Sequence, residues 1–149
     1  MKLTPHFTLD EMIHSQTATR HDIDNHPSAD HLVNLVYTCQ GLEAIRALFG
    51  HHPIQVSSGY RSPKLNRRIG GSSRSAHMSG LAADFTIPGY TVDQVVKGIA
   101  RSKIVYHQVI DEFGRWIHLS IHPFNQGHER IDLLARRKNG KTIYSRVIA

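Results

Sequence analysis

The segment Ser75-Ala76-His77-Met78-Ser79-Gly80-Leu81-Ala82-Ala83-Asp84 carries one imidazole and one carboxylate among mostly small residues. Further along the chain, Trp116-Ile117-His118 adds a second imidazole. Zn²⁺ is bound by His nitrogen and Asp oxygen in tetrahedral geometry, and catalytic sites use three protein ligands so that the fourth position can hold a water with a pKa of about 7. The pattern therefore predicts a zinc site at His77, Asp84 and His118, and a hydrolase is the first functional hypothesis.

Chance spacing is the alternative explanation, because the chain contains 12 histidines. The surroundings of the three residues argue against chance. His77 lies in a Ser/Gly-rich stretch, and His118 alternates with apolar Ile117 and Leu119 as in a strand. Asp84 has apolar neighbours, and a buried carboxylate needs a cation or hydrogen-bond donors. Zinc with two imidazoles would satisfy that need.

Length and composition fit a single globular domain over residues 1–149, with 40% hydrophobic and 20% charged residues. The N-terminus lacks the apolar core of a secretory signal, and no apolar run approaches the ~20 residues that span a bilayer. We therefore expect synthesis in the cytoplasm without a signal peptide, and no membrane span. We also expect a monomer. The single cysteine, Cys39, falls on an apolar helical face and is expected to be a buried core residue.

The formal net charge is +6, and basic residues gather at Arg67-Arg68 and at Arg136-Arg137-Lys138 with Lys141. Positive charge favours polyanionic partners, either nucleic acid or the anionic bacterial cell wall. No helix-turn-helix, zinc-finger or RNA-recognition pattern accompanies the charge, so specific nucleic-acid binding is not expected. A solvated basic face is the simpler interpretation of either cluster.

Hydrophobic periodicity predicts helices first and a sheet later, hence an α+β fold in which helices pack on a small, largely antiparallel sheet. Expected helices follow Thr8, run from Ser28 to Phe49, begin at Ser62-Pro63, and begin at Thr91. Expected strands cover 54–57, 81–87, 106–113, 116–121, 130–136 and 142–147. Gly114 and Asn139-Gly140 mark two hairpin turns.

A zinc hydrolase also needs a general base, and the acids near His118 are Asp111 and Glu112. A three-residue turn at 113–115 would pair Glu112 with Trp116 and place Glu112 on the same sheet face as His118. A two-residue turn would instead bring Asp111 opposite His118. The residues alone leave both registers open.

Three motifs together resemble the zinc D-Ala-D-Ala carboxypeptidase family: Ser57-Ser58-Gly59-Tyr60-Arg61-Ser62-Pro63, then the His77 to Asp84 segment, then Glu112-Phe113-Gly114-Arg115-Trp116-Ile117-His118. The resemblance runs from Phe7 to about Ile121 and is strongest to single-domain phage or prophage members. It implies a Hedgehog/DD-peptidase-like zinc site and a zinc peptidase that cleaves D-amino-acid-containing peptides of peptidoglycan. It also implies action on the cell wall after release from the cell or as part of a phage particle.

The same resemblance implies roles for two further residues. Glu112 takes the place of the base, six residues before the last zinc ligand, and Arg61 that of the arginine that holds the substrate carboxylate or the polarised carbonyl. Other branches of the family place an acid where this chain has Arg115.

Four more residues are candidates for the substrate cleft. Trp116 is expected to form an aromatic wall, and Ser75 either bonds near the metal or shapes its loop. Gln108 and His107 enter the same hairpin and are candidates to line the cleft, with simple polar strand positions as the alternative. Two other functions compete with the enzyme: a catalytically silent zinc-containing module that binds the wall, and a basic nucleic-acid-binding protein.

Overall fold

The computed structural model describes residues 1–123 and 130–149, so His128 lies outside the described residues. The chain begins with a small hairpin of β1 (Lys2–Thr4) and β2 (Phe7–Thr8). Two short helices follow, α1 (Leu9–Ile13) and α2 (Gln16–Arg20), and then the long helix α3 (Ala29–Leu48). The expected helix after Thr8 is confirmed, with its capping box to Glu11, whereas the first hairpin and α2 were not predicted.

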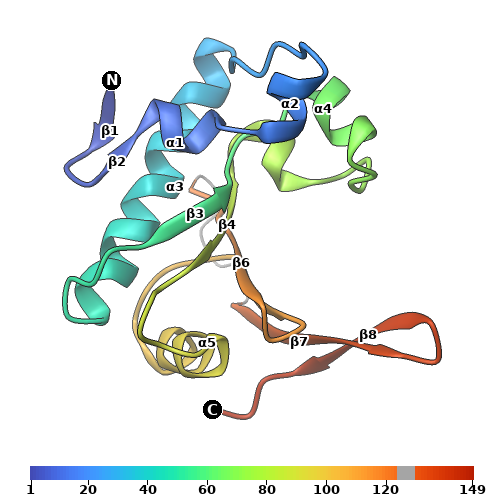
Figure 1. The fold of residues 1–149 in the computed structure, drawn as a ribbon. Coiled ribbons are helices and arrows are strands. Elements are labelled where there is room, and N and C mark those ends of the chain that lie inside the picture. Colours follow the sequence, from blue (N-terminus) through green and yellow to red (C-terminus); the bar gives the residue numbers. More distant parts are fainter. Residues whose placement is uncertain (124–129) are drawn as a thin grey trace.

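The remaining strands of the described residues form one sheet in the order β3-β4-β6-β5-β7-β8 (Figure 1). Their bounds are β3 (Gln55–Ser58), β4 (Ala82–Thr86), β5 (Gln108–Glu112), β6 (Trp116–Ser120), β7 (Ile131–Lys138) and β8 (Lys141–Arg146). All neighbours are antiparallel except β5 and β7, which run parallel. The largely antiparallel sheet is thus confirmed, and the strand ends agree with the expected ones within two residues.

Three helical segments connect these strands: α4 (Pro63–Arg68), the 3₁₀ helix η1 (Ala76–Ser79) and α5 (Val92–Arg101). Ser62 caps α4 with Pro63 in its first turn, and Thr91 caps α5 in a capping box with Gln94, as expected. The segment around His77 forms the helix η1 rather than an irregular loop, and η1 ends at Gly80 in the left-handed conformation (φ 78°).

Helices α3 and α5 cover one face of the sheet and bury the main core there (Figure 1). From β6, Ile117 and Leu119 point into this core and are almost fully buried. Gly41 of α3 lies close to the sheet, since a methyl group on it would be 3.7 Å from the Leu119 side chain. Alternate residues along each strand face opposite sides, so the residues between the core positions emerge on the other face.

Two smaller expectations are confirmed. Cys39 is fully buried in α3, and burial raises the pKa of its thiol to about 12, which fits a core residue rather than a nucleophile. Asn139 and Gly140 take positive φ angles (52° and 76°) at the turn between β7 and β8. In the described part of the chain no helix has both the length and the apolar character for crossing a bilayer.

Candidate metal centre and cleft

Two neighbouring strands and the 3₁₀ helix bring the three predicted zinc ligands together. Asp84 of β4 is paired directly with His118 of β6. Asp84 Oδ1 lies 2.9 Å from His118 Nδ1 and 3.2 Å from His77 Nε2. One ligand atom from each residue lies within 4.8 Å of the others, so a single ion between them can contact all three.

The orientation of His77 is fixed from behind by a backbone carbonyl. Its Nδ1 lies 2.7 Å from the carbonyl oxygen of Gly59, which can only accept, so Nδ1 carries the proton and Nε2 presents its lone pair to the site. Metal-binding histidines regularly donate the N–H of their other ring nitrogen to a carbonyl or carboxylate in this way. The donor set and the His77 tautomer therefore fit zinc.

Asp84 is buried, and its electrostatics suit a ligand. Burial alone would raise the pKa of this carboxyl, but the close contacts with His118 and His77 outweigh burial and hold the pKa well below its usual range. Arg61 adds a third partner, with its Nη2 at 3.4 Å from Asp84 Oδ2. Asp84 is therefore the anionic centre around which the cationic and imidazole groups of the site gather.

The register of the hairpin between β5 and β6 shows which of the two acids, Asp111 or Glu112, lies on the same sheet face as His118. Glu112 pairs with Trp116 and Ile110 pairs with His118, which is the register of the three-residue turn. Glu112 therefore shares the face of His118. It is half-buried, and desolvation raises the pKa of its carboxyl above the usual 4.5. The alternative with Asp111 opposite His118 is wrong.

Asp111 instead points to the core face of the sheet, where it is fully buried. Its carboxylate accepts hydrogen bonds from both Nη atoms of Arg136, at 2.8 and 3.1 Å, and one from the Gly114 amide at 2.8 Å. These bonds give Asp111 a structural role. They also engage Arg136, one member of the basic cluster at Arg136-Arg137-Lys138.

Arg61 lies in the same cleft, held by three polar neighbours. Its Nε donates to Ser58 Oγ (3.0 Å) and its Nη1 to Asn66 Oδ1 (3.5 Å), besides the contact with Asp84. Burial lowers the pKa of the guanidinium, and Asp84 works against that shift. Among the described contacts three of the five N–H groups are used, so two remain to hold a ligand oxygen.

A cleft of about 590 Å³ opens over this centre. Besides the three ligands it is lined by Arg61, Glu112, Trp116, Gln108 and His107, as predicted, and by residues that the sequence analysis had not named as cleft residues, among them Arg74, Ser120 and Tyr144. Ser75 also reaches the cleft, and its hydroxyl accepts a hydrogen bond from the His77 amide at 3.2 Å, so it caps η1. Ser75 therefore shapes the loop that carries the ligand.

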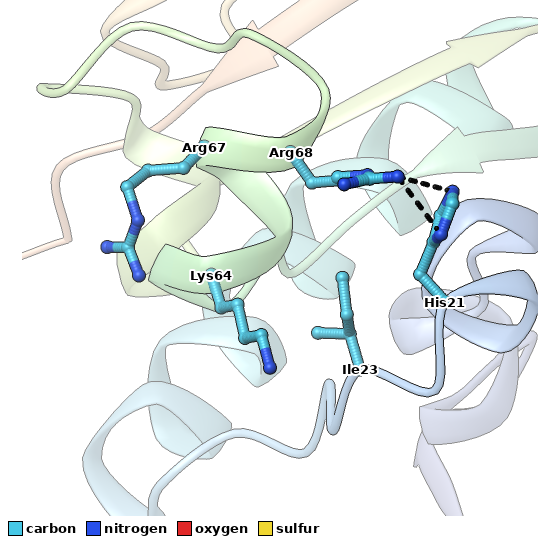
Figure 2. Close-up of a pocket in the computed structure, with 5 residues that line it drawn as sticks. All are labelled: His21, Ile23, Lys64, Arg67 and Arg68. Carbon is cyan, nitrogen blue, oxygen red and sulfur yellow. Dashed lines mark hydrogen bonds between the residues drawn. The ribbon is translucent and has the colours of Figure 1, made fainter.

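A second cavity, of about 650 Å³, lies beside α4 and is lined by His21, Ile23, Lys64, Arg67 and Arg68 (Figure 2). Arg68 Nη2 lies 3.2 and 3.3 Å from the two ring nitrogens of His21, of which a neutral imidazole offers one as acceptor, and Lys64 extends toward Ile23. These lining residues include no carboxylate or nucleophile. The Arg67-Arg68 cluster thus forms a basic surface apart from the metal centre.

The sequence analysis missed Gly59, whose carbonyl orients His77. A methyl group on Gly59 would lie 2.3 Å from the Met12 carbonyl oxygen, so only glycine fits there. Its position in the Ser57 to Pro63 motif was the available signal. Tyr144 was missed because it reaches the cleft only through the pairing of β8 with β7, near the C-terminal end of the chain.

Two histidines and an aspartate around one point, with a carboxylate and a guanidinium in the same cleft, are typical of metal-dependent hydrolases. The chain belongs to the peptidase M15 family, which it matches over residues 5–120. It is also similar to a zinc D-Ala-D-Ala carboxypeptidase of Streptomyces albus G, with 45% identity over 51 residues. That match covers 34% of this chain and 20% of the relative, so the chain spans a minor part of the relative's length. The resemblance seen in the three motifs is thereby confirmed at the level of the family.

Proposed function

We propose that this protein is a zinc-dependent peptidase that hydrolyses amide bonds in D-amino-acid-containing peptides of bacterial peptidoglycan. The observation that carries the proposal is the convergence of His77, Asp84 and His118 within 4.8 Å, with Glu112 and Arg61 lining the same cleft. Membership of the peptidase M15 family and the similarity to a zinc D-Ala-D-Ala carboxypeptidase support the choice of metal and substrate.

His77, Asp84 and His118 would hold the ion, which supplies Lewis acidity and lowers the pKa of water. Glu112 is the general base: it takes a proton from the attacking water and passes it to the nitrogen of the departing amine. The raised pKa of its carboxyl suits both halves of this transfer.

Arg61 would bind the substrate oxygen. Its two uncommitted N–H groups offer charge-assisted hydrogen bonds to a peptide carboxylate or to the carbonyl oxygen as negative charge develops there. Trp116 and Gln108 line the same cleft and would contact the peptide on either side of the reacting amide. Asp84 holds the guanidinium in place through the 3.4 Å contact.

Peptides that end in D-Ala-D-Ala provide the test, with released amine measured against time. We expect cleavage that stops when a chelator removes the metal and returns when Zn²⁺ is added back. Arg61→Lys keeps the charge but loses the planar fork, so it should weaken cleavage markedly. Zinc-loaded protein that sediments with purified walls yet releases no fragment detectable by mass spectrometry would favour the silent binding module instead.

The finer proposal is a role in cell-wall lysis by a phage or prophage, which the resemblance to single-domain phage members supports. Purified protein added to isolated walls should lower their turbidity in a chelator-sensitive manner. The same protein inside an intact bacterium should leave the wall unharmed until the membrane is permeabilised. Lysis without permeabilisation would contradict this route to the wall.

A further inference from the structure

The hairpin of β7 and β8 lies beyond residue 120, where the match to the peptidase M15 family ends. It extends away from the rest of the molecule at the edge of the sheet (Figure 1). Between Ile131 and Arg146 it carries five basic residues against the single acid Asp132. The five are Arg136, Arg137, Lys138, Lys141 and Arg146. This charge is therefore a property of this chain outside the part that defines the family.

Strand register divides these residues between the two faces. Tyr144 pairs with Ala135, which pairs in turn with Glu112, so Tyr144 and Glu112 share a face. Arg146 pairs with Leu133, which pairs with Ile110 opposite His118, and so lies on this face as well.

Arg137 lies two residues after Ala135 and therefore also faces the cleft side, beside its pairing partner Thr142. We call Arg137, Tyr144 and Arg146 the hairpin ledge. Lys138 and Lys141 pair with each other on the opposite face, which is also the face of Arg136 and its partner Asp111.

Tyr144 connects the hairpin ledge to the metal cleft. Tyr144 lines the cleft and is 55% exposed, and the buried Ala135 is all that separates its row from Glu112. Two strand spacings make that separation about 10 Å between backbones, which is two to three residues of an extended peptide. A peptide with its scissile amide at Glu112 therefore reaches Tyr144 a few residues away.

We propose that the hairpin ledge is a substrate subsite that binds a free carboxylate of the peptide, a few residues from the scissile bond. Arg137 and Arg146 flank Tyr144, and guanidinium groups bind carboxylates through paired hydrogen bonds. The exposed ring of Tyr144 would pack against the apolar part of the peptide residue that carries this carboxylate. The inference rests on the proposed peptidase function and adds an acidic peptide as its preferred substrate.

Nucleic acid is the competing partner for basic residues, but it would use charge on both faces of the hairpin. The ledge joins two arginines and an exposed tyrosine to a cleft that holds a hydrolytic site, which fits a short acidic peptide better. The two faces therefore provide their own control. If the ledge is a substrate subsite, removing a charge from the ledge changes the preference for an acidic peptide, and removing a charge from the opposite face does not.

The test uses two D-Ala-D-Ala peptides that differ only in one side-chain carboxylate before the scissile bond, free in one and amidated in the other. We expect kcat/KM to favour the free acid by about tenfold. Arg137→Gln and Arg146→Gln should bring this ratio close to one, chiefly through KM. The matched controls Lys138→Gln and Lys141→Gln remove the same charge from the other face and should preserve the ratio.

Equal kcat/KM for the two peptides in the wild type, or equal loss of preference in the control variants, would overturn the subsite. Failure of zinc-loaded protein to cleave either peptide would instead contradict the proposed function. The proposed subsite would then be tested by the dissociation constants of the same peptides, measured by fluorescence anisotropy. Tighter binding of the free acid, lost on Arg146→Gln, supports the subsite, and equal binding refutes it.

Discussion

Gly59→Ala is the substitution whose effect on the metal centre follows most directly from the geometry. The new methyl group would lie 2.3 Å from the Met12 carbonyl oxygen, whereas real contacts of this kind are not shorter than 3.0 Å. The obstacle is backbone, so the segment around residue 59 must move by about 0.7 Å. The same segment holds the carbonyl that accepts the hydrogen bond from His77 Nδ1 at 2.7 Å.

A shift of that size weakens or misaligns the His77 hydrogen bond, since N–H···O bonds have an optimum near 2.9 Å and fall off steeply with angle. Loss of such a supporting bond typically lowers metal affinity by about 10- to 100-fold. We therefore expect zinc affinity, measured by competition with a chromophoric chelator, to fall by that factor in Gly59→Ala while the fold is retained by circular dichroism.

Gly41→Ala is the matched control. A methyl group on Gly41 would make ordinary contacts at 3.7 and 3.8 Å with Leu119 and Ile121, and alanine favours a helix by about 1 kcal/mol over glycine. This variant should bind zinc as the wild type does and melt at an equal or higher temperature. Unchanged zinc affinity in Gly59→Ala would refute the role given to the Gly59 carbonyl.

Three further predictions concern the two acids. Glu112→Gln should lower kcat by about a hundredfold or more while the zinc content measured by elemental analysis stays near one per chain, and loss of zinc would contradict the role of base. Asp111→Asn should lower the free energy of unfolding by about 1 to 2 kcal/mol, measured in urea, because it weakens the bond to half-exposed Arg136, and kcat should change little. Cleavage should decline as pH falls through the raised pKa of Glu112, so the acid midpoint of kcat/KM should lie above 4.5, and a midpoint below 4.5 would argue against Glu112.

Local sequence signals predicted most of the fold because each is a short-range effect. Ser62-Pro63 and Thr91 provide caps, and Asn139-Gly140 provides a turn, all within a few residues of the helix or hairpin they define. The hairpin of β1 and β2 escaped prediction because its strands have only three and two residues. Periodicity needs longer segments to be visible.

The site divides in the same way. His77, Asp84 and His118 were recognisable because each offers metal-binding chemistry in an unusual local setting. The choice between Glu112 and Asp111 depended on whether a turn has two or three residues, and a shift of one residue exchanges the faces of a strand. Tyr144 reaches the cleft through the parallel pairing of β5 with β7, which no short motif announces.

Zinc-edge anomalous diffraction from crystals of the purified protein tests the central claim most directly. We predict one peak per chain, within about 2.0 to 2.2 Å of His77 Nε2, an Asp84 carboxylate oxygen and His118 Nδ1. The ring pair of His107 and His122, with centroids 4.2 Å apart in the same cleft, offers an internal alternative. A peak at that pair and none between His77, Asp84 and His118 would contradict the account.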